Sequence, residues 1–156
     1  MSATYRRIEL LRGTWGTVLL VGPRGVMRAL GVHVDTSSIV VARILGARHI
    51  IQAASSGVNP SPEVLAVGVW VDAVHAATAI GLAAADTKRA HAGLLDALVA
   101  GIWAASGYRD LARARATPQR HQRVRDQWAR DVLSVVPGGR TLLGRVDQDR
   151  HLGHDR

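Results

Sequence analysis

One apolar run organises this chain: it reads EVLAVGVWVDAVHAATAIGLAAA and extends from Glu63 to Ala85. The 22 residues that begin at Val64 would form a helix of about 33 Å, which is enough to cross the roughly 30 Å hydrocarbon core of a bilayer. Two ionisable residues, Asp72 and His75, stand in the middle of the run. We therefore predict a membrane-spanning helix that carries polar side chains at the depth of the bilayer.

The composition of the 156-residue chain indicates one small folded unit, with no room for a second sizeable core. Hydrophobic residues make up 47% of the chain, the formal net charge is +8, and Lys88 is the only lysine. Cysteine is absent, which excludes disulfides and thiol chemistry. The chain also lacks dinucleotide-binding, Walker, nucleophile-elbow and His-Glu-x-x-His motifs, which argues against a soluble enzyme. We expect no catalytic residues, no metal ligands and no cofactor.

Three further apolar segments flank the central run, and their spacing predicts helices over residues 10–30, 39–55 and 90–108. The Gly22-Pro23 pair breaks or kinks the first of them. Asp35 and the Thr and Ser residues that follow it are N-cap candidates for the second. Together with the central run, these segments predict an all-α fold, a small membrane helical bundle of three to four spans within residues 1–108.

The placement of arginine predicts the orientation of the spans, because cytoplasmic loops carry an excess of Arg and Lys. The N-terminus is basic through Arg6 and Arg12, and the C-terminal tail is basic as well. Two cytoplasmic ends require an even number of spans, so we prefer four, with residues 10–30 as an imperfect first. A three-span alternative places Lys88-Arg89 on the cytoplasmic side of the membrane, but it places the basic tail on the opposite side. We therefore predict a protein of the inner (plasma) membrane with cytoplasmic N- and C-termini.

Residues 109–156 form a basic tail with eleven Arg against six Asp. An amphipathic helix is expected over about residues 119–136, with its apolar stripe centred on Trp128, and residues 140–156 are expected to be mobile. Arginine beside an apolar stripe fits anionic lipid or a protein partner, whereas nucleic acid is disfavoured because aromatic residues for stacking are few. The candidate lipid- or partner-binding residues are Arg120, Arg123, Trp128 and Arg130.

Charges inside a bilayer cost about 2.5–3.5 kcal/mol per residue on insertion scales, so such residues pair or face a cavity. Arg43 and Arg48 on the helix over residues 39–55 balance Asp72 and Asp96 on the next two helices. Small residues share the helix faces of these acids, which would let the helices approach closely. We predict a polar intramembrane network of Arg43, Arg48, Asp72, His75 and Asp96.

Two interpretations of this network are open. It either locks the packing of the helices, or it forms a functional polar site such as a proton relay, a small-anion site or a lipid-headgroup pocket. The first favours a non-enzymatic membrane protein, an accessory or assembly subunit that contacts lipid and a protein partner or a second copy of the chain. The second favours a small oligomeric channel or carrier, or a membrane enzyme that acts on lipid. A soluble helical homodimer is the remaining alternative.

The segment from Ala42 to His49 reads ARILGARH and comes after Gly22-Pro23-Arg24. In these residues the chain resembles uncharacterised small integral membrane proteins of actinobacteria, over about residues 7–108. The resemblance implies a membrane fold of about four helices. It implies no activity, and the basic tail lies outside it.

Overall fold

A computed structural model describes residues 6–57, 60–112 and 123–154 of the chain. All regular secondary structure in these residues is helical, which confirms the all-α class predicted from the sequence. The seven helices are α1 (Arg7–Val21), α2 (Pro23–Ala29), α3 (Thr36–Ser56), α4 (Pro62–Ala85), α5 (Ala90–Ala112), α6 (Arg123–Val135) and α7 (Gly139–His154).

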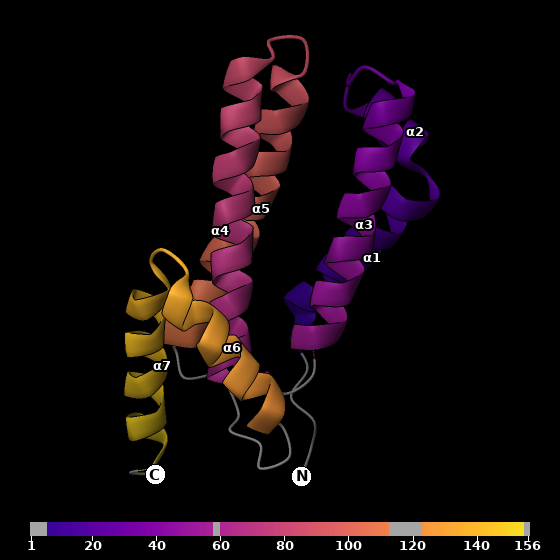
Figure 1. Ribbon diagram of the computed structural model, residues 1–156. Helices are drawn as coiled ribbons and strands as arrows, with labels where there is room; N and C mark the ends of the chain where they lie inside the picture. Colours follow the sequence, from indigo (N-terminus) through magenta and orange to yellow (C-terminus); the bar gives the residue numbers. More distant parts are fainter. Residues whose placement is uncertain (1–5, 58–59, 113–122, 155–156) are drawn as a thin grey trace.

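The helices form two columns with a pair of helices across one end (Figure 1). In one column α1 packs along α3, and in the other α4 packs along α5. The backbones of the two columns approach each other over only a short length, between α3 and α4, and side chains of α1 also reach α4 and α5. α6 and α7 pack on α4 near its start, at the end of the molecule where α1 begins. We call α1, α3, α4 and α5 the bundle, and α6 with α7 the C-terminal pair.

Local sequence signals set the starts of the two central helices. The Asp35 carboxylate accepts a hydrogen bond of 2.6 Å from the Ser38 backbone N–H, so α3 begins at Thr36, three residues before the predicted start. The Ser61 hydroxyl accepts from the Val64 N–H, and Pro62 occupies the first turn of α4, where a missing N–H costs nothing.

The Gly22-Pro23 pair interrupts the first segment, as predicted. α1 ends at Val21 after 15 residues, and α2 begins at Pro23 as a separate short helix. A helix of 15 residues is about 22 Å long, which is less than the roughly 30 Å of a hydrocarbon core. The expected span over residues 10–30 is therefore not one continuous helix.

Glycine allows the closest helix contacts in both columns. A Cβ on Gly46 would lie 2.6 Å from the Gly16 carbonyl oxygen, so α1 and α3 cross backbone against backbone. In the other column, a Cβ on Gly93 would lie 3.0 Å from the Ala79 carbonyl oxygen, and one on Gly107 would lie 2.9 Å from a Val69 methyl group. These contacts agree with the prediction that small residues let α4 and α5 approach closely.

The C-terminal pair packs on the bundle through an apolar core, which includes Leu111, Leu133 and Val146. The Trp70 indole N–H also donates 2.9 Å to the Pro137 carbonyl oxygen, between α4 and the turn before α7. In the end that was expected to be mobile, residues 140–156, the described residues 140–154 belong to α7. Leu142, Leu143 and Val146 give this mostly polar segment one apolar side, and that side packs inward.

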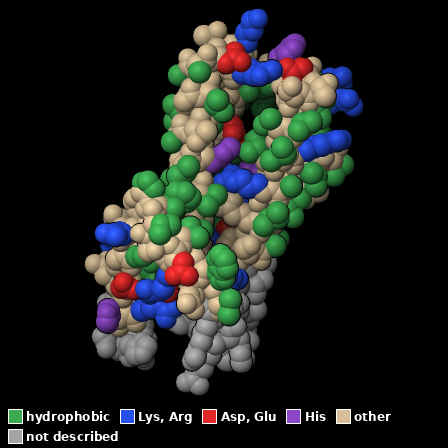
Figure 2. All heavy atoms as spheres, viewed as in Figure 1, with side chains coloured by type: hydrophobic (Ala, Val, Ile, Leu, Met, Phe, Trp, Pro, Cys, Tyr) green, Lys and Arg blue, Asp and Glu red, His purple; other side chains and the backbone are tan. Residues whose placement is uncertain are grey.

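Large apolar side chains cover the outside of both columns (Figure 2). Ile44 on α3 is 63% exposed and Leu82 on α4 is 65% exposed. Among the described helices, α4 is the one whose length and composition would let it cross a membrane. Only 28% of its most apolar window is buried inside the molecule. Its second half exposes Val74, Ile80 and Leu82, whereas Leu65 and Ala66 near its start are buried.

Candidate polar site in the bundle

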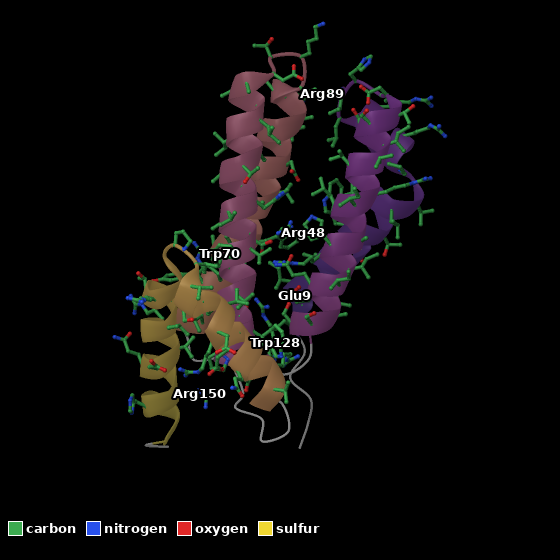
Figure 3. All side chains as sticks on the ribbon, viewed as in Figure 1. Glu9, Arg48, Trp70, Arg89, Trp128 and Arg150 are labelled. Carbon is green, nitrogen blue, oxygen red and sulfur yellow. The ribbon has the colours of Figure 1, made fainter. Side chains whose placement is uncertain are left out.

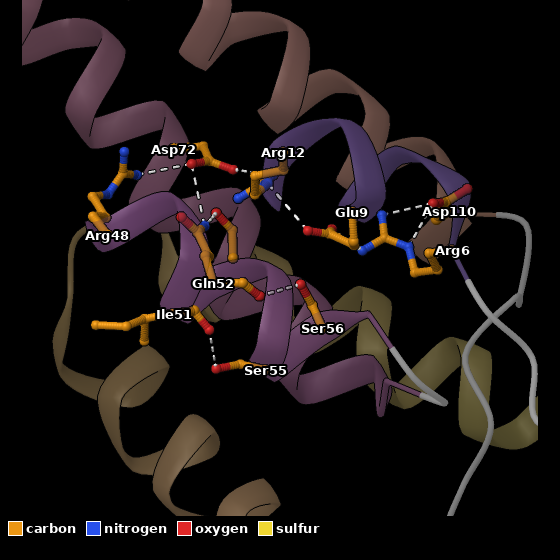
Figure 4. A network of polar contacts seen from close by, with 11 residues as sticks. Arg6, Glu9, Arg12, Arg48, Ile51, Gln52, Ser55, Ser56, Asp72 and Asp110 are labelled. Atoms are coloured by element: carbon orange, nitrogen blue, oxygen red, sulfur yellow. Dashed lines mark hydrogen bonds and ion pairs between the residues drawn. The ribbon is translucent and has the colours of Figure 1, made fainter. Parts of the chain in front are cut away.

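Asp72 is the centre of a buried charge cluster between the two columns (Figure 4). Its side chain comes from the middle of α4, and the residue is only 1% exposed. The Arg48 guanidinium donates 2.8 Å to one carboxylate oxygen, and the Arg12 guanidinium donates 2.9 Å to the other. The Gln52 amide adds a hydrogen bond of 3.2 Å to the same oxygen as Arg48. One carboxylate thus joins three helices, α1, α3 and α4.

The cluster continues along α1 to the end of α5. Arg12 lies 3.2 Å from the Glu9 carboxylate, and Arg6 lies 2.6 Å from the other oxygen of Glu9. Arg6 also donates to Asp110, at 2.9 and 2.7 Å, so the chain of contacts reaches α5. We call these residues the Asp72 cluster: Arg6, Glu9, Arg12, Arg48, Gln52, Asp72 and Asp110. Its three arginines balance its three carboxylates.

Helical spacing puts the members of the cluster on the inner faces of their helices. Arg48 and Gln52 are one turn apart on α3, and Glu9 and Arg12 are three residues apart on α1, so each pair shares a face. The Arg12 guanidinium also lies 5.1 Å from the centre of the Trp103 ring on α5, within the range of a cation–π contact. All four bundle helices therefore meet at these charges.

The structure divides the network predicted from the sequence. It brings Arg48 to Asp72, and it places His75 with Asp96 in a separate pair. It leaves Arg43 out, because that residue is exposed and has no ion pair within the described part of the chain. Arg43 precedes Arg48 by five residues, which corresponds to about 140° around a helix, so both cannot face the same carboxylate. The inclusion of Arg43 was therefore wrong.

Several members of the Asp72 cluster were missed in the sequence. Arg12 was interpreted as a basic residue near the membrane surface, and Glu9 was not considered. Glu9 lies three residues after Arg6 and three residues before Arg12. This i,i+3 spacing was a usable signal, because it predicts that opposite charges are adjacent on one helix face. Asp110 had no such signal, since its contact with Arg6 joins residues far apart in the sequence.

His75 and Asp96 border a cleft between the upper halves of the columns. The His75 Nε2 atom lies 2.8 Å from a carboxylate oxygen of Asp96. The cleft has a volume of about 440 Å³, and its walls are mostly apolar and come from α2, α3, α4 and α5. Figure 3 places Arg89 at the upper end of the cleft, where it donates 3.0 Å to Asp35 across the two columns.

Asp35 has two roles at this end of the cleft. Hydrogen bonds from Ser38, chiefly from its backbone N–H, lower the pKa of Asp35 to about 2, and the bond from Arg89 acts in the same direction. The carboxylate therefore stays ionised while it caps α3 and bridges to the loop after α4.

Glu63 holds a second buried charge group, where α4 meets the C-terminal pair. The residue is 0% exposed, and one of its oxygens accepts from Arg150 at 2.6 Å and from Arg130 at 3.0 Å. Arg130 also donates 2.8 Å to Asp147. These acids raise the pKa of Arg130, with the Asp147 bond as the largest cause. Glu63 also lies in the first turn of α4, where a carboxylate interacts favourably with the helix dipole.

The predicted lipid- or partner-binding residues have different surroundings. Trp128 is 69% exposed on α6. Arg130 is already engaged by Glu63 and Asp147, so its proposed contact with lipid is not supported. Arg123 is the first residue of α6, and Arg120 lies outside the described residues, as does the predicted helix start at residue 119.

Among the described residues, no group of three His, Asp or Glu side chains could hold a metal ion. Comparison of the chain with protein-family models, with curated proteins and with solved structures finds no match. The suggested resemblance to actinobacterial membrane proteins stays a prediction. The positions of the charged and apolar side chains in this fold are therefore the basis for inferring a function.

Proposed function

We propose that this chain is a non-enzymatic integral membrane protein, which acts as an accessory or assembly subunit of a larger complex in the plasma membrane. The bundle helices lie in the bilayer, and the C-terminal pair lies on the cytoplasmic side with both termini. One observation supports this most directly: Glu9, Arg12 and Asp72 are buried in the bundle, while large apolar side chains are exposed on all four of its helices. Soluble proteins have the opposite arrangement.

The apolar exterior is too extensive to be incidental in water. Exposed Leu, Ile and Val side chains occur on α1, α3, α4 and α5. Large contiguous apolar patches on a monomer mark a membrane or protein interaction site. Inside a bilayer, by contrast, charged residues face the bundle interior and pair with one another, as Asp72 does with Arg12 and Arg48.

The charge balance of the Asp72 cluster supports a structural role for the network. Three arginines and three carboxylates neutralise each other across all four bundle helices, which fits a device that holds the helices together. The outer apolar faces then remain for contact with lipid or with helices of a larger partner. A balanced charge network inside and apolar faces outside are typical of a subunit that binds lipid or a protein partner, and neither feature requires catalysis.

The absence of cysteine offers a direct test of the membrane topology. Single cysteines are introduced at Thr87, in the loop between α4 and α5, and at Ser134, on the exposed side of α6. The four-span arrangement predicts that an impermeant thiol reagent labels the Thr87→Cys variant in intact cells and labels Ser134→Cys only after lysis. Labelling of both before lysis, or extraction of the protein without detergent, would exclude this topology.

The accessory role needs a separate experiment. The full chain is purified by affinity from native membranes in mild detergent, and co-purifying proteins are identified by mass spectrometry. We expect larger membrane subunits in stoichiometric amounts, and we expect Asp72→Asn to lose both the partners and the stability of the chain. Recovery of the chain alone from native membranes would contradict the accessory role and leave the topology untouched.

A second candidate function, a small carrier, is favoured by the cleft beside His75 and Asp96. This pair lies outside the balanced Asp72 cluster, and it borders a cavity. The histidine ring can accept and release a proton, and histidine is a frequent proton carrier. In liposomes, a carrier would give a pH-dependent flux that Asp96→Asn abolishes while the protein stays folded. An unchanged flux in that variant would exclude this role for the pair.

A further inference from the structure

Asp96 has different surroundings from the acid at the centre of the bundle. Asp72 is 1% exposed, and each of its two oxygens accepts from an arginine. The Asp96 side chain is 28% exposed, and its ion-pair partner within the described part of the chain is His75, whose Nε2 atom lies 2.8 Å from one carboxylate oxygen. The second oxygen of Asp96 has no bond to a described residue. This carboxylate therefore has no arginine or lysine partner among the described residues.

The charge of Asp96 is not balanced inside the bundle. A neutral imidazole can donate an N–H but adds no positive charge, so with His75 in this form the pair carries a net charge of −1. The Asp72 cluster cannot supply the missing charge, because its three arginines already contact three carboxylates. An uncompensated carboxylate in apolar surroundings is costly, and a bound cation would reduce that cost.

The cleft between the upper halves of the columns gives a ligand access to this pair. Asp96 and His75 both line it, and Figure 2 shows acidic and histidine side chains in the furrow between the columns. The volume of about 440 Å³ is within the roughly 300–1,000 Å³ that is usual for ligand pockets. Its walls are mostly apolar and include Met27, Val41 and Leu82. Such walls cannot replace the water around a small inorganic ion, but they suit the apolar substituents of an organic cation.

The charges at the outer end of the cleft cancel one another. Arg89 lies 3.0 Å from Asp35 and 4.0 Å from Asp86, and Lys88 is exposed in the same loop. These two acids and two bases sum to zero. Asp96 follows Arg89 by seven residues, so it lies about 10 Å deeper along α5. The unbalanced negative charge of the cleft is therefore in its depth, behind a mouth that is neutral overall.

We propose that this cleft binds a lipophilic organic cation, an amine or quaternary ammonium compound with apolar substituents. Its charged centre contacts the free oxygen of Asp96, and its substituents lie against the apolar walls. His75 contacts the other oxygen and so fixes the direction of the carboxylate. Charge complementarity selects this occupant, because an anion of the same shape would be repelled by Asp96. The inference rests on the carrier candidate proposed above, since it names the class of substrate for the same cleft.

The test measures binding to the full chain, purified in a mild neutral detergent, by equilibrium dialysis at about pH 8, where an imidazole in water is neutral. The probes are tetraphenylphosphonium and tetraphenylborate, which have nearly the same size and shape but opposite charge. Detergent without protein gives the background. We expect saturable binding of the cation and binding of the anion that is weaker by about tenfold or more. Equal or tighter binding of tetraphenylborate would overturn the proposal, because the site would then not select a cation.

Two variants change the two parts of the proposed site. Asp96→Asn keeps the shape of the side chain and removes its charge, so it should weaken binding of the cation about tenfold or more, without weakening binding of the anion. Val41→Trp fills part of the cleft from α3 and should weaken binding of the cation while Asp96 is intact. Asp131→Asn and Ile44→Trp are the matched controls, because both positions are exposed and neither lines the cleft.

Both control variants should bind tetraphenylphosphonium like the parent chain, and circular dichroism should show the same helix content in all variants. Parental binding of the cation by Asp96→Asn, or equal losses in the controls, would contradict the proposal. If Asp96→Asn does not fold, the comparison of Val41→Trp with Ile44→Trp decides. Equal binding of the cation by these two variants would place its site outside the cleft.

The outcome separates this inference from the functions proposed above. A chain that binds the cation selectively but gives no flux in liposomes keeps the binding site and excludes the carrier. A chain that gives the four-span labelling pattern but no selective binding of the cation keeps the membrane topology and excludes this inference.

Discussion

The bundle and the C-terminal pair differ in what they expose. The bundle holds Glu9, Arg12 and Asp72 in its interior and exposes large Leu, Ile and Val side chains on all four helices, whereas the exposed residues described in α7 are polar or glycine. The C-terminal pair buries Leu133 and Val146 against α4 and α5, and its charged residues are mostly at the surface. This difference fits the membrane location proposed above, with hydrocarbon around the columns and water around α7.

α6 lies where these two surroundings would meet. Its inner side packs through Ala129 and Leu133, as in a soluble protein. Its outer side carries an apolar stripe of Val124, Trp128 and Val135, all exposed. A helix with exposed valine and tryptophan beside its packed side, and with charged residues on its remaining face, fits the surface of a membrane. The contrast between the two regions can therefore be tested at particular residues.

The largest expected effect comes from the bundle side of the comparison. Asp72→Asn leaves Arg12 and Arg48 buried with one carboxylate fewer, and a broken buried ion pair costs about 3–5 kcal/mol. We expect a large fall in the thermal midpoint in detergent and in accumulation in membranes. Asp131→Asn, at an exposed position of α6, is the control and should melt like the parent chain. Equal melting of both variants would contradict the central role of Asp72.

The corresponding change in the C-terminal pair should have a smaller and more local effect. Glu63→Gln weakens the bonds from Arg130 and Arg150, and hydrogen bonds to charged groups contribute about 1.5–3 kcal/mol. These arginines are partly exposed and can be hydrated, unlike those of the Asp72 cluster. Hydrogen exchange should therefore accelerate in α6 and α7 and stay unchanged in α1 and α3. Faster exchange throughout the bundle would show that the two regions are not independent.

Next in size is the packing of α1 on α3. Gly46→Ala places a methyl group 2.6 Å from the Gly16 carbonyl oxygen, so the helices must separate, at a cost of about 1–3 kcal/mol. Gly101→Ala is the matched control, because a Cβ at that position meets nothing within 4 Å. Unfolding in detergent should show a loss of stability for the first variant and none for the second. A stable Gly46→Ala variant would mean that the crossing is looser than described.

The smallest effect concerns pH at the end of the cleft. Because its pKa is lowered, Asp35 stabilises the fold at every pH above its ordinary value of 3.8, and this contribution is lost as the pH falls toward 2. The Ser38 amide should therefore stay protected from exchange at pH 5 and lose protection below about pH 3. Asp35→Asn should remove this pH dependence. Loss of protection already at pH 5 would show that Ser38 does not hold the carboxylate.

Periodicity was enough to predict the main helices, since α3, α4 and α5 each contain a long apolar segment bounded by Pro, Gly or charged residues. It was not enough for α7, where the apolar residues are few and the average composition is polar. The approach of Arg48 to Asp72 followed from charge balance between neighbouring helices. The same reasoning from charge balance wrongly included Arg43 in the network. The angular position of Arg43 on α3, relative to Arg48, already excluded a contact with the same carboxylate.

Contacts that join distant parts of the chain could not be predicted. Nothing near Glu63 in the sequence indicates Arg150, because the link exists only after α6 and α7 fold back onto α4. Arg12 resembled any basic residue at the start of a membrane helix, and its contact with Asp72 depends on how the two columns stand together. Tertiary geometry, rather than local pattern, determines these pairs.

The division of the Asp72 cluster between two hairpins has a consequence for biosynthesis. The ribosome completes α1 and α3 before it makes α4, so Arg48 leaves the exit tunnel ahead of its carboxylate partner. In the proposed membrane, the nascent first hairpin therefore carries excess positive charge and is a poor candidate for release into lipid. The insertion machinery would have to retain it until the second hairpin arrives, and the two would then enter the bilayer as one unit.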